Sequence, residues 1–177
     1  KNKILELIEE GSTIGLGGSA SLNEIEIIPE LRCEKYKLLD RYKPGLTPEE
    51  TQDIFRKSFF ADFYLTGTNA ITMQGELVNM DYTANRVGAL MFGPKKVIIV
   101  AGYNKIVADI DQAINRVRKY AAPINAKRLN RKTPCAVTGQ CADCSSPDRI
   151  CSNLVVTYKQ NKPGRGIVIL VGEELGF

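Results

Sequence analysis

The chain has 177 residues, of which 44% are apolar, and a formal net charge of +4 at pH 7. This length and composition are typical of one globular domain over residues 1–177, and no apolar run reaches the roughly 20 residues of a membrane span. Lys and Arg form no long basic run, so the mild positive charge allows an anionic ligand but does not indicate binding to nucleic acid.

The chain opens with an amphipathic pattern, and residues 3–9 predict a helix that ends at Gly11. The pattern contains acidic residues and no secretory signal, so we expect a cytoplasmic location. Because it begins without Met and inside a helical pattern, we also expect residues upstream of Lys1.

A glycine-rich loop follows the first predicted strand, residues 13–16. It contains Gly17, Gly18 and Ser19, and a capping-box pattern (SLNE) then predicts a helix over residues 21–32. Glycines in such a loop let the backbone approach a ligand, and free N–H groups favour a phosphate or carboxylate. The loop is neither a P-loop nor a complete G-x-G-x-x-G fingerprint, so a tight turn without a ligand is the alternative.

Two further elements are predicted before residue 61. Residues 37–40 are a candidate strand. The sequence T-P-E-E at residues 47–50 is a second capping box, with proline at the first helical position. It predicts a helix over residues 47–60.

The middle of the chain predicts strand, hairpin, helix and strand. Residues 63–66 are short, apolar and β-prone, and glycine after Gln74 predicts a hairpin over residues 71–78. Asn85 is a candidate N-cap for a helix over residues 86–92. Residues 97–100 are apolar on both faces, as a buried parallel strand should be.

The polar residues of this region fall at strand ends and helix starts. They are Asn69, Asn79, Asn85, Arg86, Asn104 and Lys105. In an open α/β sheet these places meet in one crevice beyond the carboxyl ends of the strands, so the set predicts a ligand site there. The alternative is that the Asn residues only cap helices and form turns.

The last third predicts two helices and two strands. A helix that starts at Asp109 or Asp111 and runs through Tyr120 is broken at Pro123, and a short helix to residue 129 follows. Residues 153–159 and 166–171 are strands joined by a hairpin or by a longer connection. The alternation of helices and strands predicts an α/β fold with a mostly parallel sheet.

Four of the five cysteines lie in a Cys-rich loop at residues 133–152. They are Cys135, Cys141, Cys144 and Cys151, with the spacing C-x5-C-x2-C-x6-C. The chain contains no His, so a closed tetrahedral metal site would need all four thiolates. Structural zinc, an iron–sulfur cluster and free or paired thiols without metal all remain open. Cys33 falls late in a predicted helix and is interpreted as a packing residue.

Several of these segments together resemble the LUD domain, the lactate-utilisation family. They are GSTIGLGGSASLNEI (residues 11–25), GTNAITMQGELVN (67–79), Asn85-Arg86, Gly93-Pro94 and Asn104-Lys105-Ile106. The Cys segment resembles that of stand-alone, single-domain members. The resemblance covers nearly the whole chain.

The resemblance implies a parallel sheet flanked by helices, as in the superfamily of sugar-phosphate isomerases and CoA transferases. It also implies a glycine loop that binds phosphate or CoA, and a link to conversion of lactate to pyruvate alongside an iron–sulfur oxidoreductase subunit. The acidic motif of ribose-phosphate isomerases is absent, so that activity is not carried over. Glu76 is the nearest candidate for the CoA-transferase glutamate, with a solvated hairpin residue as the alternative.

The first functional hypothesis is a ligand-binding or accessory subunit for oxidation of lactate or a related hydroxy acid. The proposed ligand-binding residues are Gly17, Gly18 and Ser19 through backbone N–H groups, Arg86 and Lys105 through charge, and Asn69, Asn79 and Asn85 through orientation. On this hypothesis Arg86→Ala weakens anion binding without unfolding the protein.

Two other hypotheses are kept. The chain could be an independent enzyme on a sugar phosphate or CoA ester, with Glu76 or Lys105 as the acid or base. It could instead be an electron-transfer protein in which the four cysteines hold an iron–sulfur cluster. No residue of the sequence specifies the substrate.

Overall fold

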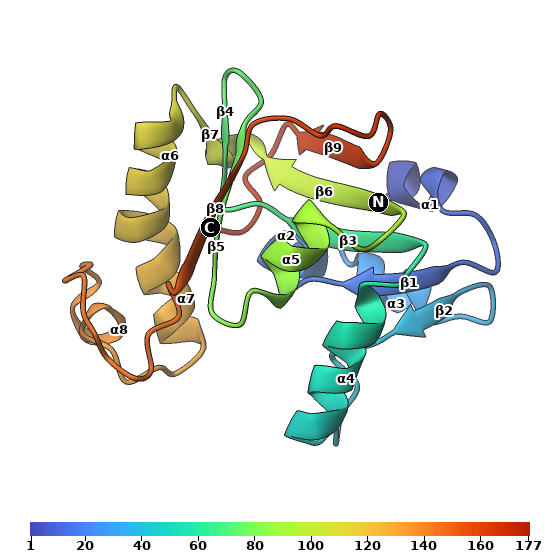
Figure 1. Ribbon diagram of the computed structural model, residues 1–177, viewed down its shortest axis with the longest axis horizontal. Helices are drawn as coiled ribbons and strands as arrows, with labels where there is room; N and C mark the ends of the chain where they lie inside the picture. Colours follow the sequence, from blue (N-terminus) through green and yellow to red (C-terminus); the bar gives the residue numbers. More distant parts are fainter.

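The computed structural model describes all 177 residues and contains two sheets (Figure 1). The main sheet has the strand order β2-β1-β3-β6-β9, and every pair in it is parallel. Its strands are β1 (Thr13–Leu16), β2 (Lys37–Leu39), β3 (Phe63–Gly67), β6 (Lys96–Gly102) and β9 (Gly166–Val171). The predicted α/β fold with a mostly parallel sheet is confirmed.

A smaller mixed sheet stands beside the main one, with the order β7-β4-β5-β8. Its strands are β4 (Ala70–Thr72), β5 (Leu77–Asp81), β7 (Ile106–Val107) and β8 (Asn153–Thr157). β4 and β5 form the predicted antiparallel hairpin, and Gly75 supplies the positive φ of +92° that its turn requires. The two last strands lie in different sheets, so a longer connection joins them rather than a hairpin.

Helices cover both faces of the main sheet. The helices of the whole chain are α1 (Asn2–Leu7), α2 (Ala20–Glu24), α3 (Ile27–Leu31), α4 (Pro48–Ser58), α5 (Asn85–Met91), α6 (Ile110–Arg116), α7 (Ala122–Arg128) and α8 (Pro134–Thr138), with a 3₁₀ helix η1 (Tyr103–Lys105) and a π-helix η2 (Val117–Ala121). Helices α1, α2 and α3 pack on one face through a core that includes Leu22, Leu65 and Ile98. Helix α5 packs on the other face, against Tyr64 and Ile99.

The central strands are buried on both faces, as parallel strands between two helical layers must be. All five residues of β3 are buried, and β6 is buried from Val97 to Gly102. Helix α6 and η2 pack instead on the small sheet, where Ala113 and Val117 meet Ala70 and Val78. No helix of the structure is long and apolar enough to cross a membrane.

Two predicted helix starts are wrong in detail. Ser19, not Ser21, caps α2, because its hydroxyl accepts the Leu22 N–H at 3.2 Å. The helix predicted over residues 21–32 is two short helices, separated by Glu26 with a left-handed φ of 52°. At α5 the N-cap position is Ala84, and the free N–H groups of the first turn are bound by Asp81 rather than Asn85.

The break predicted at Pro123 is also wrong. α6, η2 and α7 follow one another without interruption, and Figure 1 shows them as one long helical column. Pro123 lies at the start of α7, directly after the π-helical turn. A π turn changes the hydrogen-bond register, so the missing N–H of proline is tolerated there.

The capping box at Thr47 is confirmed on both sides. The Thr47 hydroxyl accepts the Glu50 N–H at 3.2 Å, and the Glu50 carboxylate accepts the Thr47 N–H at 2.8 Å. α4 therefore begins where the sequence predicts it.

Candidate functional site

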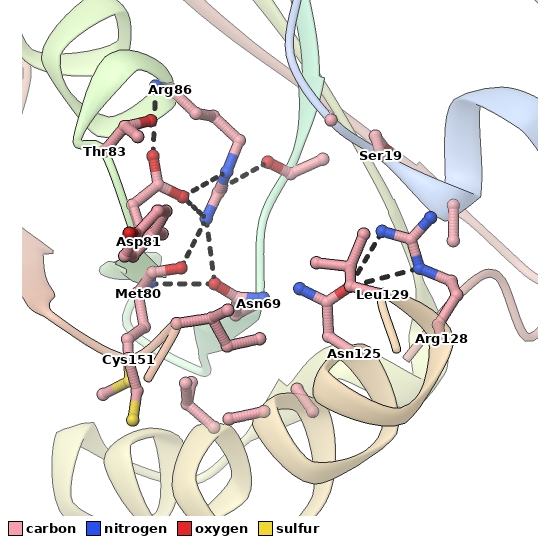
Figure 2. Close-up of a pocket in the computed structure, with 18 of the residues that line it drawn as sticks. Ser19, Asn69, Met80, Asp81, Thr83, Arg86, Asn125, Arg128, Leu129 and Cys151 are labelled. Atoms are coloured by element: carbon pink, nitrogen blue, oxygen red, sulfur yellow. Dashed lines mark hydrogen bonds and ion pairs between the residues drawn. The ribbon is translucent and has the colours of Figure 1, made fainter. Parts of the chain in front are cut away.

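A cavity of about 410 Å³ lies beyond the carboxyl ends of β1 and β3. Its walls come from the loop after β1, the segment after β3, the β5–α5 connection, and the helical column of η2 and α7. Figure 2 shows side chains from these elements around one open space. The carboxyl ends of parallel strands are where open α/β sheets bind ligands, and this volume suits a small molecule.

Arg86 is the best-connected side chain of the cavity wall. Its Nε donates to Asp81 Oδ1 (3.0 Å), its Nη1 to Asn79 Oδ1 (2.5 Å) and Gly67 O (3.3 Å), and its Nη2 to Asn69 Oδ1 (3.0 Å) and Met80 O (3.1 Å). Figure 2 shows several of these bonds converging on one guanidinium. A guanidinium has five N–H donors, so this network leaves none free for a ligand.

The charge of Arg86 is also balanced inside the protein. Its ion pair with Asp81 is 2.8 Å long, and the two side chains are only 8% and 10% exposed. The same carboxylate accepts the backbone N–H groups of Arg86 and Val87, each at 3.0 Å. Arg86 thus ties the β5–α5 connection to the end of β3. Asn79, which accepts one of the Arg86 hydrogen bonds, is buried and does not line the cavity.

Asn69 lies between this network and the cavity. Its amide oxygen accepts hydrogen bonds from Arg86 and from the backbone N–H of Met80, at 3.0 and 2.9 Å. The Asn69 Nδ2 group has no acceptor in the protein, so it can donate to a ligand. Asn85 also contacts the cavity, and its amide oxygen accepts the Thr83 hydroxyl.

Lys105 is a buried cation on the cavity wall, with a relative exposure of 3%. Its Nζ donates to Ser21 Oγ at 2.9 Å and forms no ion pair with a carboxylate. Burial lowers the pKa of Lys105 to about 8, and the nearby cations Arg116 and Arg86 add to the effect, while Glu24 opposes it. The ammonium form therefore lacks a counter-ion inside the protein.

The glycine loop presents free backbone donors to the cavity. The Gly17 N–H donates to Leu65 O at 2.8 Å, whereas the N–H groups of Gly18 and Ser19 donate to no protein atom. Gly17 has no room for a side chain, because an added Cβ would lie 2.5 Å from Thr66 Oγ1. The loop is thus kept close to β3, and its two free N–H groups are available to an anion.

Arg41 is a candidate binding residue that the sequence analysis missed. Its guanidinium stacks 4.4 Å from the centre of the Phe55 ring and makes no hydrogen bond or ion pair with the protein. It faces Gly18, whose added Cβ would lie 3.6 Å from Arg41 Nη1. Arg41 follows β2 in an ordinary turn, and no local pattern indicates that β2 lies next to β1 and its loop.

Two further arginines contribute from the far wall. Arg128 donates twice to Asn125 Oδ1, at 3.1 and 2.8 Å, as Figure 2 shows. Arg131 stacks 5.4 Å from the Tyr82 ring centre and lies 3.5 Å from Asp148. The cavity wall thus carries five cations, four arginines and Lys105, but only one carboxylate, Asp81, which Arg86 neutralises. Its excess charge is positive.

Glu76 does not lie at the cavity. It sits in the β4–β5 hairpin, where its carboxylate accepts the Thr72 hydroxyl, and it is absent from the cavity wall. Asn104 is likewise occupied elsewhere, because its side chain holds the C-terminal segment through Leu175 N (3.2 Å) and Gly176 O (3.1 Å). The structure therefore brings together the glycine loop, Asn69, Asn85, Arg86 and Lys105, without Glu76.

The four cysteines of the Cys-rich loop surround one small second cavity of about 20 Å³. All four are free thiols, and no group of three or more side chains is arranged to hold a metal ion. Arg149 fixes the loop by donating to the carbonyl oxygens of Cys144 (2.7 Å) and Cys151 (3.0 Å). Cys151 and Met80 line both cavities, so the Cys-rich loop borders the main one.

Comparison with solved structures finds 14 matching chains, among them two of low sequence identity. A DUF162 family protein from Deinococcus radiodurans is 18% identical, with a TM-score of 0.43, and the match covers 97% of this chain and 93% of that chain. The β subunit of eIF2B from Chaetomium thermophilum is 12% identical, with a TM-score of 0.39, over 60% of this chain and 41% of that chain. No curated protein matches.

The family comparison covers almost the whole chain. The profile described as the LUD domain matches residues 1–171, which include the glycine loop, the Arg86 network, Lys105 and the four cysteines. The resemblance found in the sequence motifs is therefore confirmed, and the chain belongs to the LUD domain family.

Proposed function

We propose that the chain binds a small anionic ligand as the accessory subunit of a system that oxidises lactate or a related hydroxy acid to the keto acid. Membership of the lactate-utilisation family supports this class of reaction. The observation that carries the proposal is a concave site with unneutralised positive charge. Arg41 and Lys105 both face the cavity without a carboxylate partner.

The ligand's carboxylate or phosphate would be held at the glycine loop. The free N–H groups of Gly18 and Ser19 supply two donors there, and Arg41 supplies a guanidinium stacked on Phe55. Charge-assisted hydrogen bonds of this type are about twice as strong as neutral ones. Lys105 and the amide of Asn69 would contact the rest of the ligand. Arg86 would act indirectly, by fixing Asn69.

The position and the partners of the acidic residues near the site support an accessory role. Asp81 is the only carboxylate of the wall, and it is fully engaged by Arg86 and the start of α5. Glu76 lies outside the cavity. No carboxylate side chain of the wall is therefore free to act as a base, and we propose that an iron–sulfur oxidoreductase partner supplies the oxidation step.

Titration calorimetry with L-lactate, pyruvate and inorganic phosphate tests the site directly. Arg41→Ala should weaken binding of the preferred anion by about tenfold, because it removes a charge-assisted hydrogen bond from a partly exposed site. Arg56→Ala is the matched control, since Arg56 is an exposed arginine of α4 that pairs with Asp53 at 2.9 Å. Equal affinities for both variants, or no binding of any of the three anions, would contradict the proposal.

A second candidate function is metal-based electron transfer at the Cys-rich loop. The observation that favours it is the arrangement of all four thiols around one small cavity next to the main one. Four thiols without His are a donor set that suits structural zinc or an iron–sulfur cluster. Metal binding would require the thiols to move closer together, and the loop has no regular structure between Gly139 and Ser152 that would oppose this.

Metal analysis with a visible spectrum on protein purified without oxygen tests this candidate. We expect a metal content that is kept in Cys33→Ser and lost in the double variant Cys141→Ser/Cys144→Ser. Iron with a broad visible absorption would favour electron transfer, whereas one zinc per chain would make the loop a structural element. Metal-free wild-type protein would rule out both the zinc site and the iron–sulfur cluster at the Cys-rich loop.

A further inference from the structure

Lys105 combines two properties that a purely structural lysine does not need. It is almost completely buried, yet it faces the main cavity and has no carboxylate partner. Its single hydrogen-bond partner is the Ser21 hydroxyl, which donates its own hydrogen to Leu175 O at 3.2 Å. Ser21 can therefore hold the Lys105 nitrogen in place, but it cannot neutralise the ammonium charge.

The surroundings of Lys105 make its neutral amine more accessible than that of a lysine in water. The charged groups that influence it are Arg116, Arg86 and Glu24, of which the two arginines disfavour the ammonium. Because burial acts in the same direction, the pKa of Lys105 falls to about 8, so roughly a tenth of the side chain is an unprotonated amine at pH 7 and about half at pH 8. Desolvated lysines of this kind are nucleophiles toward carbonyl groups.

The position of Lys105 relative to the glycine loop defines the compound that it could attack. Ser21, which holds the Lys105 nitrogen, lies two residues after Ser19, which lines the cavity and whose N–H donates to no protein atom. Ser19 and Lys105 line the same cavity, so an anion held by the loop would share that space with the lysine, and a reactive carbon beside the anion is what Lys105 would attack. A short molecule with a carboxylate next to a carbonyl group meets this requirement.

We propose that Lys105 is a catalytic residue that forms an imine with the carbonyl carbon of an α-keto acid bound in the main cavity. This inference rests on the proposed function, because it takes the keto acid to be the anion that the cavity holds. In the first step the neutral Nζ forms a bond to the carbonyl carbon, and the nitrogen's proton passes to the carbonyl oxygen. Loss of the resulting hydroxyl together with the nitrogen's second hydrogen, as water, then gives the C=N bond.

Reductive trapping tests the inference. The folded protein is incubated with pyruvate and sodium cyanoborohydride, whose hydride reduces the imine carbon and leaves a stable secondary amine. We expect one adduct per chain, heavier by the mass of the keto acid less one oxygen atom, and peptide mapping should place it on Lys105. Its rate should saturate with pyruvate concentration, and L-lactate, which has a hydroxyl in place of the keto group, should slow it.

Two variants separate the inference from simple charge effects. Lys105→Arg keeps the positive charge but cannot form an imine, so it should lose the adduct. Lys95→Arg removes an exposed lysine at the far edge of β6 and should keep it. Pyruvate binding in calorimetry without a saturable adduct on Lys105 would overturn the imine and leave the proposed function intact. Absence of both binding and adduct would overturn both.

Discussion

Replacement of Arg86 by alanine should lower the free energy of unfolding by roughly 3–5 kcal/mol, the usual cost of removing one partner of a buried ion pair. The variant leaves Asp81 only 10% exposed and without its counter-ion. It also leaves the amide oxygens of Asn69 and Asn79 without a guanidinium donor. Unsatisfied buried polar groups add to the cost, because folding no longer compensates their lost hydration.

Urea unfolding followed by circular dichroism measures this effect, and Lys95→Ala provides the control. Lys95 pairs with Asp62 at 2.7 Å, but the lysine side chain is 76% exposed, so its loss should cost less than about 1 kcal/mol. A change of the same small size for Arg86→Ala would show that the network does not hold the cavity wall together. From the sequence alone, Arg86→Ala was expected to weaken anion binding and leave the fold intact. The structure revises that expectation, because every Arg86 donor points into the protein.

Binding of L-lactate should weaken by roughly tenfold between pH 7 and pH 9. The pKa of Lys105 is lowered to about 8, so its ammonium form dominates at pH 7 and is the minor form at pH 9. The anion binds the ammonium better than the amine, hence affinity is highest below the pKa and falls as pH rises through it. Lactate is the suitable probe because its carboxylate stays ionised throughout this range.

Lys105→Met separates this effect from other titrating groups. Calorimetry should show that the variant binds lactate more weakly than the wild type at pH 7 and has a nearly flat profile up to pH 9. Lys105→Arg should also be flat, because arginine stays charged, but at higher affinity than the methionine variant. If the wild-type affinity for lactate changed with pH in the same way as that of Lys105→Met, Lys105 would be excluded as the group whose titration controls binding.

Local patterns in the sequence predicted most of the individual elements. The buried strand at residues 97–100, the hairpin at Gly75 and the capping box at Thr47 all follow from interactions within a few residues. Such features depend on hydrophobic periodicity, on a glycine φ angle and on hydrogen bonds between near neighbours. These are properties of short peptide segments, so the sequence reports them directly.

Long-range packing decided the features that were predicted incorrectly. Ser21 fits a capping box as well as Ser19 does, but its hydroxyl is taken by Leu175 and Lys105, which lie 154 and 84 residues further along the chain. Asn85 fits an N-cap, yet Asp81 binds the free N–H groups of α5. In both cases several nearby side chains could cap the helix, and contacts with distant residues determined which of them does.

The sequence by itself determined the α/β class, the family and the polar residues that gather at the strand ends. Only the tertiary structure decided which of them line the cavity and which of their donors stay free. It enclosed Arg86 among acceptors from β3 and β5, moved Glu76 away in the hairpin, and brought Arg41 from beyond β2 to the glycine loop. A charge is free for a ligand only when no other group neutralises it, and that depends on residues far apart in the chain meeting in the folded protein.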